Sequence, residues 1–122
     1  MVEWTEDNFG NEGARDYLSM MTSKLVATVK EVMGDDERLR PEEDGESLLM
    51  PSLAILALLC ESCGASPPRP SVVKQWHEKY IAAFDAGIEA MDPPHGLVPN
   101  RRRVIENTFR WLESLAESYY QQ

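Results

Sequence analysis

The apolar positions of the chain recur at helical spacing, and no stretch shows the strict alternation of a half-buried strand. The first periodic stretch covers residues 11–34, with Asn11 placed to cap its N-terminus and Gly34 placed to end it. Its apolar stripe comprises Ala14, Tyr17, Leu18, Met21, Leu25, Thr28, Val29 and Val32. This pattern predicts an amphipathic helix of about six turns.

The second helical stretch, residues 51–63, is apolar on nearly every side. Residues 53–59 contain no polar side chain, Pro51 suits the first turn of a helix, and Gly64 is placed to stop it. Because a helix that is hydrophobic all round must be buried, we expect this helix to be the central one, with the others packed around it.

Two further helices are predicted after proline-rich breaks at residues 66–70 and 92–96. Ser71 and Asn100 are the expected N-caps. Gly87 falls inside the third pattern, so this helix is either kinked or split there, or packs closely against a neighbour. The apolar stripes are Val73, Trp76, Tyr80, Ile81, Phe84, Ile88 and Met91, then Val104, Ile105, Thr108, Leu112, Leu115, Ala116 and Tyr119. The fold class predicted for residues 1–122 is an all-α, single-domain bundle of four helices, or five if Gly87 breaks the third.

Residues 34–50 lack periodicity and are predicted to form an acidic loop. Residues 35–46 hold seven acids against two arginines, together with one proline and one glycine. This composition is typical of a mobile, solvated segment. The basic triplet at residues 101–103 is expected to face it.

The overall charge indicates which kinds of partner the protein is expected to bind. The net charge is −9, from 21 acidic and 12 basic residues, and the sequence pI is about 4.6. Such a field repels phosphate backbones, which argues against nucleic acid and favours a basic protein as partner. We count no apolar run of the roughly 18 residues that cross a bilayer, and the polar, acidic N-terminus is unlike a signal peptide. We therefore expect a cytoplasmic protein with no membrane contact.

The first residues carry a motif, Trp-x4-Phe-x-Asn-acid-x-Ala-x-Asp-aromatic. It falls on Trp4, Phe9, Asn11, Glu12, Ala14, Asp16 and Tyr17. It resembles the opening signature of a family of small bacterial proteins, domain of unknown function 4259, and this resemblance implies a bacterial source but no particular activity. We expect the motif to be structural, with residues 1–10 forming an arm that packs on the bundle through Trp4 and Phe9.

Two further features could carry chemistry. Cys60 and Cys63 form a C-x-x-C, but they lie at a predicted helix C-terminus, where the helix dipole opposes a thiolate. His77 lies on the apolar side of the third helix, where a lone histidine is expected to be an uncharged core residue. We expect neither a metal nor a cofactor.

Two hypotheses about function follow. The favoured one is a protein–protein interaction or regulatory module, for example an immunity-type inhibitor, that binds a basic protein through an acidic surface. Its expected binding residues are Glu42, Glu43, Asp44 and Glu46. The alternative is a small all-α metal-dependent hydrolase using helical carboxylates at Glu12, Asp16, Glu113 and Glu117. An enzyme should bring four or more acids together in a pocket.

Overall fold

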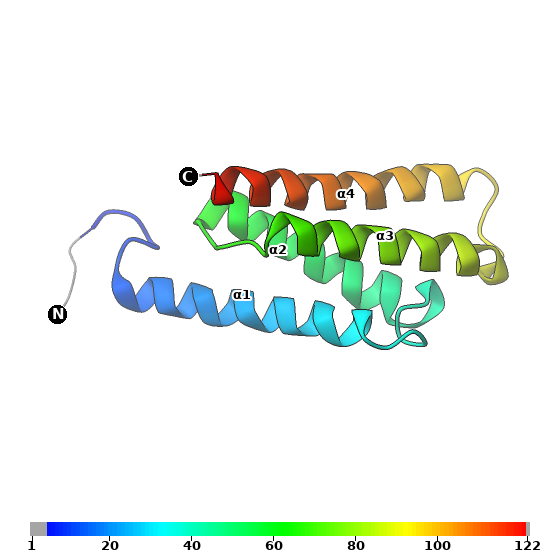
Figure 1. Ribbon diagram of the computed structural model, residues 1–122, viewed down its shortest axis with the longest axis horizontal. Coiled ribbons are helices and arrows are strands. Elements are labelled where there is room, and N and C mark those ends of the chain that lie inside the picture. The colour runs from blue at the N-terminus through cyan, green and yellow to red at the C-terminus, as the bar shows by residue number, and fades with distance from the viewer. Residues whose placement is uncertain (1–4, 122) are drawn as a thin grey trace.

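The computed structural model describes residues 5–121 and consists of helices lying side by side along the long axis of the molecule (Figure 1). There is no strand among these residues, so the all-α prediction is confirmed. The four long helices are α1 (Glu12–Met33), α2 (Met50–Cys63), α3 (Pro70–Gly87) and α4 (Leu97–Tyr120). A kinked helical segment, η1 (Pro41–Leu49), leads into α2; the kink lies at Glu43, whose dihedrals (φ −95°, ψ −116°) are not helical. A 3-10 turn, η2 (Ile88–Met91), follows α3.

The helices form a ring in which α1 packs on α2, α2 on α4, α4 on α3 and, to a lesser extent, α3 on α1. Their buried side chains meet in one core. As predicted, α2 supplies fully buried residues, among them Leu53, Leu56 and Ala57. It is not enclosed on every side, however, because Ile55 and Leu58 are 46% and 51% exposed. Although α2 has apolar residues on every side, one side of it remains exposed to solvent.

The predicted start and end of α1 are confirmed. The Asn11 side-chain oxygen accepts a hydrogen bond of 2.8 Å from the Ala14 N–H, and the chain leaves the helix at Gly34. This cap satisfies one of the backbone donors that a helix N-terminus leaves unpaired.

The predicted caps of α3 and α4 are wrong. Pro70 is the first residue of α3, so Arg69 rather than Ser71 holds the cap position. Proline suits the first helical position because its fixed φ is already helical and it has no N–H to satisfy. Likewise α4 begins at Leu97, after Gly96 in the left-handed conformation (φ 84°), and Asn100 lies within its first turn.

Gly87 ends α3, as one reading of the sequence predicted, and η2 follows directly. It also lies close to a neighbour, because a Cβ at this position would stand 3.0 Å from Pro41 Cδ. The break and the close approach thus occur together, where α3 meets η1.

The prediction of a mobile loop over residues 34–50 is wrong for most of its length. Residues 41–49 are the helical segment η1, in which Pro41, Gly45 and Leu49 are buried. A Cβ on Gly45 would stand 2.5 Å from the Leu39 carbonyl oxygen and 2.7 Å from Cε1 of Tyr80. Only glycine lets this backbone approach α3 so closely. Pro41 and Gly45 provide much of this packing. Because neither is a large apolar side chain, the hydrophobic periodicity of the sequence did not indicate that this segment is buried.

The continuity of η1 and α2 bears on the expectation that no segment crosses a bilayer. The helical segment Pro41–Cys63 is long and apolar enough to cross a membrane by length and composition, with a mean hydropathy of 1.5 over its best 18-residue window. The core helix of a soluble protein passes the same test, and one third of this window is buried inside the bundle. The length and hydropathy of this segment therefore do not distinguish a buried core helix from a membrane-spanning helix.

Candidate functional site

The acidic residues predicted to bind a partner lie at the end of the bundle where α1 finishes and η1 begins (Figure 1). Glu42 and Glu43 are exposed. The exposed carboxylates of this region are Glu31, Asp35, Asp36, Glu37, Glu42 and Glu43, and we call this set the acidic end. The structure therefore brings two of the four predicted residues to a surface shared with four acids outside the predicted set.

Asp44 has a partner within the fold. Its Oδ2 accepts a hydrogen bond of 2.7 Å from Arg38 Nε, and both side chains are a little over one third exposed. The hydrogen bond to Asp44 raises the pKa of Arg38. This local ion pair spans the turn that leads into η1 and leaves Asp44 less available to a partner than the prediction supposed.

Glu46 is the anchor of η1 rather than part of its exposed surface. Its Oε2 accepts a hydrogen bond of 2.7 Å from the hydroxyl of Tyr80 on α3, which is fully buried. Arg101 on α4 donates to both Glu46 oxygens, at 2.7 Å from Nε and 3.3 Å from Nη2. We call Glu46, Tyr80 and Arg101 the anchor triad. Burial and the hydrogen bond to Glu46 raise the pKa of Tyr80, so the hydroxyl remains a donor.

The basic triplet divides its contacts between two neighbours. Arg101 faces the acidic segment, as predicted, whereas Arg102 pairs with Asp85 on α3 through hydrogen bonds of 2.9 and 3.0 Å. The hydrogen bond from Arg102 lowers the pKa of Asp85. Arg103 donates to the side chain of Asn100. Two of the three arginines thus connect α4 to neighbouring elements.

His77 does not lie in a purely apolar core. Its Nε2 is 2.6 Å from Oε2 of Glu106 on α4, and its ring stacks on Phe109 with centroids 4.9 Å apart. The two polar side chains are 18% and 17% exposed. Arg110 Nη2 on the same helix lies 3.7 Å from Glu106 Oε2.

The motif residues lie near the start of α1, apart from Trp4, which falls outside the described residues. Phe9 and Ala14 are half-buried, and Asn11 caps α1. Glu12 and Asp16 are exposed. The structural role predicted for the motif is therefore visible at Asn11.

The carboxylates of the hydrolase hypothesis do not form a metal-binding group with one another. Glu113 and Glu117 lie near the C-terminal end of α4, half-buried and exposed respectively. Over residues 5–121, no three His, Cys, Asp or Glu side chains are arranged to hold a metal ion. Cys60 is a free, half-buried thiol, and burial raises its pKa to about 11, away from a reactive thiolate.

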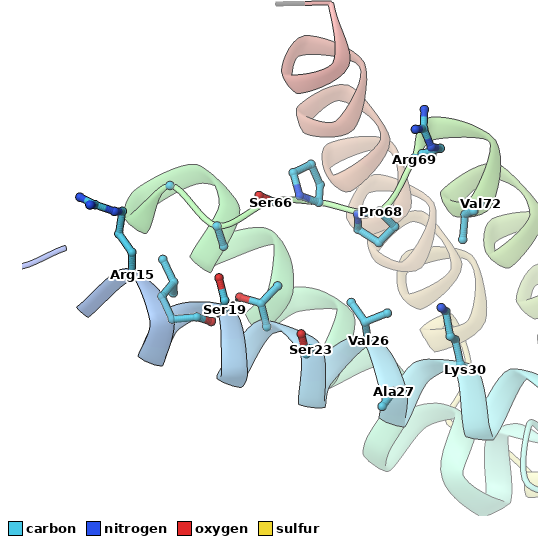
Figure 2. A pocket seen from close by; sticks show the side chains of 15 residues that line it. Arg15, Ser19, Ser23, Val26, Ala27, Lys30, Ser66, Pro68, Arg69 and Val72 are labelled. Carbon is cyan, nitrogen blue, oxygen red and sulfur yellow. Dashed lines mark hydrogen bonds between the residues drawn. The ribbon is translucent and has the colours of Figure 1, made fainter. Parts of the chain in front are cut away.

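A groove that the sequence did not predict lies between α1 and the connector, residues 64–69, which joins α2 to α3 (Figure 2). Its volume is about 650 Å³. Three cations line it, Arg15, Lys30 and Arg69, and no carboxylate among the described residues does. The only signal in the sequence was that these cations lie off the apolar stripes, which gave no reason to group them.

No family model, curated protein or solved structure matches the chain, so no relative indicates what these surfaces bind. The resemblance of the N-terminal motif to domain of unknown function 4259 stays a prediction.

Proposed function

We propose that this protein is an interaction or regulatory module that binds a basic protein through the acidic end, within the cytoplasm of a bacterial cell. The observation that carries the proposal is the excess of negative charge there. Residues 31–43 present six exposed carboxylates and only two arginines. Arg38 is already paired with Asp44, and Lys79 on α3 pairs with one of the six, Asp36, at 3.5 Å.

Such a surface favours a basic partner for two reasons. Complementary charge speeds the encounter of two proteins and suppresses partners of the same sign. The charges are also too exposed to contribute much to the stability of the fold, since surface ion pairs contribute about 0–1 kcal/mol. Their accumulation at one end is therefore better explained by recognition than by folding.

The anchoring of η1 strengthens the proposal. A mobile loop would lose conformational entropy on binding, at a cost of about 0.5–1.5 kcal/mol for each side chain that becomes immobilised. Here Glu42 and Glu43 project from a segment that the anchor triad attaches to α3 and α4. Much of the backbone ordering is thus complete before a partner arrives.

The test is capture of host proteins on immobilised full-length chain at low and moderate salt. One variant neutralises exposed acids only: Asp36→Asn, Glu37→Gln, Glu42→Gln and Glu43→Gln. Asp44 and Glu46 are left intact because their loss would disturb the fold. We expect a specific basic protein to be retained by the wild type at low salt, weakened by added salt and lost with this variant.

A matched control removes the same number of charges elsewhere: Glu12→Gln, Asp16→Asn, Glu113→Gln and Glu117→Gln. It should retain the partner, because the charge lost lies outside the acidic end. Retention of the same proteins by both variants, or equal loss with both, would show that the acidic end is not the binding surface. The control also removes every carboxylate of the hydrolase hypothesis.

A further inference from the structure

The outer side of α2, opposite the core, is apolar and uncovered. Ile55 and Leu58 are both about half exposed, Pro51 is exposed one turn before them, and Ser62 is exposed one turn after them. The sequence has no charged residue from position 47 to position 60. Single apolar residues are common on protein surfaces, whereas a continuous apolar patch marks a surface that binds something.

α4 lies beside α2 and runs in the same direction (Figure 1). Two contacts show how the helices align. Just past the end of α2, the hydroxyls of Ser66 and Tyr119 are 2.9 Å apart, and these residues are 53 positions apart in the sequence. Near the start of both helices, Pro51 and Val104 line one hollow of about 220 Å³, and they are separated by the same 53 positions. Each residue of α2 therefore lies beside the α4 residue 53 positions later.

This offset relates two stripes of equal spacing. One lies on α2 and the other on α4: Pro51, Ile55, Leu58 and Ser62, and Val104, Thr108, Trp111 and Leu115. The α4 stripe is exposed at Val104 and half-buried at its other three positions. Both stripes advance by four, three and four residues, the spacing that lines one side of a helix, and neither holds a charged residue. We call these eight residues the double stripe.

The symmetry of the double stripe favours a second copy of the chain as its occupant. A two-fold axis through the centre of this face would place the α2 stripe of each copy on the α4 stripe of the other, with the helices antiparallel. One operation then covers both stripes with the same set of contacts, as in an isologous interface. Antiparallel helices packed at a shallow angle are the usual arrangement of four-helix bundles.

Charge favours the same arrangement. Two chains of net charge −9 repel each other, so contact between copies is least opposed where a face has no acids. The acidic end lies near the start of α2, because η1 leads into that helix. Antiparallel packing therefore puts the two acidic ends at opposite ends of the pair, whereas parallel packing would bring them together.

We propose that the double stripe is the interface of a symmetric dimer of this chain, in which α2 of each copy packs antiparallel on α4 of the other. With the two-fold axis at its centre, Leu58 faces Thr108 of the other copy and Ile55 faces Trp111 of the other copy. The acidic end stays exposed, so the dimer does not depend on the function proposed above.

The size of the face indicates how tightly the copies bind. A stripe of 12 residues is about 18 Å long, and two helices are together about 20 Å wide. Such a face is smaller than the roughly 800 Å² per partner of a standard interface. We therefore expect a weak dimer, with a dissociation constant of about 10–100 µM.

The experiment is sedimentation equilibrium of the full-length chain from about 1 µM to about 500 µM. The mass should rise from 13.8 kDa toward twice that value. Added salt should strengthen the dimer because it screens the repulsion between the chains, whereas the same salt should weaken a basic partner at the acidic end. A mass that stays at 13.8 kDa throughout would overturn the proposal. Binding of that monomer to phosphatidylcholine vesicles would assign the double stripe to a lipid surface instead.

Matched variants locate the interface. Ile55→Lys with Leu58→Lys should weaken the dimer at least about tenfold. These lysines lower the net negative charge, so greater overall repulsion cannot explain the loss. The control, Met20→Lys with Met91→Lys, makes the same charge change at exposed apolar residues on α1 and η2 and should not weaken the dimer. Circular dichroism checks that both variants fold, and equal weakening in both would overturn the proposal.

Disulfide cross-linking tests the antiparallel arrangement. One chain carries Leu58→Cys and another carries Thr108→Cys, each with Cys60 and Cys63 replaced by alanine. A mixture of the two chains should form a cross-linked dimer faster than either chain alone. Faster cross-linking of the Leu58→Cys chain with itself would contradict the pairing of α2 with α4.

Discussion

Removal of the Glu46 carboxylate tests whether η1 is an anchored part of the fold. In Glu46→Ala the Tyr80 hydroxyl, on a fully buried residue, loses its acceptor, and Arg101 loses both of its hydrogen bonds to the carboxylate. Hydrogen bonds to charged groups contribute about 1.5–3 kcal/mol, and breaking a fully buried ion pair costs about 3–5 kcal/mol. Arg101 and Glu46 are 30% and 21% exposed, so water compensates part of the loss. We expect the free energy of unfolding to fall by about 3 kcal/mol.

Two companion variants separate the contributions. Tyr80→Phe removes only the hydroxyl and should cost about 1–2 kcal/mol, because Glu46 keeps its two hydrogen bonds from Arg101. The double variant should cost less than the sum of the single ones, by about 1 kcal/mol, since both remove the same hydrogen bond. Glu42→Ala is the control: an exposed acid on the same segment, whose loss should change stability by less than about 0.5 kcal/mol.

The assay is urea denaturation followed by circular dichroism, with the midpoint and the slope fitted separately. Amide hydrogen exchange over residues 39–49 adds a local measure, and Glu46→Ala should speed exchange there more than in α4. The anchor triad would be refuted as a stabilising contact if Glu46→Ala unfolded at the same urea concentration as Glu42→Ala. Additive costs for Glu46→Ala and Tyr80→Phe would mean that the hydrogen bond between them contributes nothing.

Three further outcomes are expected. Gly45→Ala should lower the free energy of unfolding by about 3 kcal/mol in urea titrations, because the new Cβ would meet backbone oxygen at 2.5 Å; wild-type stability would contradict the packing of η1. Asn11→Ala should cost about 1 kcal/mol and Asn11→Ser much less, because serine also caps a helix; equal losses would argue against the cap. Alkylation of Cys60 by iodoacetamide, followed by mass spectrometry, should accelerate until about pH 11, and a plateau near pH 9 would contradict its raised pKa. Since that pKa is raised on folding, the stability due to the neutral thiol is present below pH 9 and falls as the pH rises toward 11.

The parts of the fold that the sequence predicted correctly depend on local signals. Asn11 caps α1 and Gly64, in the left-handed conformation (φ 81°), ends α2, because each acts on backbone groups within a few residues. α1 ends at Gly34 as predicted, although Gly34 keeps a right-handed φ of −82°. The same reasoning failed at Ser71 and Asn100, since Pro70 and Gly96 determine the starts of α3 and α4 before those residues. Proline fixes φ at a helical value, and glycine at Gly96 permits the left-handed φ from which α4 starts; at both sites this backbone preference outweighed the side-chain cap.

The error at η1 has a different origin. Binary patterning detects burial only through large apolar side chains, whereas Pro41 and Gly45 are buried because of their shape. The acidic composition then suggested a solvated loop. The role of Glu46 was equally hidden, because Tyr80 and Arg101 lie 34 and 55 residues away in the sequence. Only the tertiary structure distinguishes this carboxylate from Glu42 and Glu43.

The two candidate surfaces show why net charge is a weak guide to binding sites. A value of −9 predicts an acidic exterior, and the acidic end agrees with it. The groove beside the connector departs from that total, because Arg15, Lys30 and Arg69 line it and no carboxylate among residues 5–121 does. A partner responds to the field within about 8–10 Å of its own charges, so the local arrangement outweighs the total.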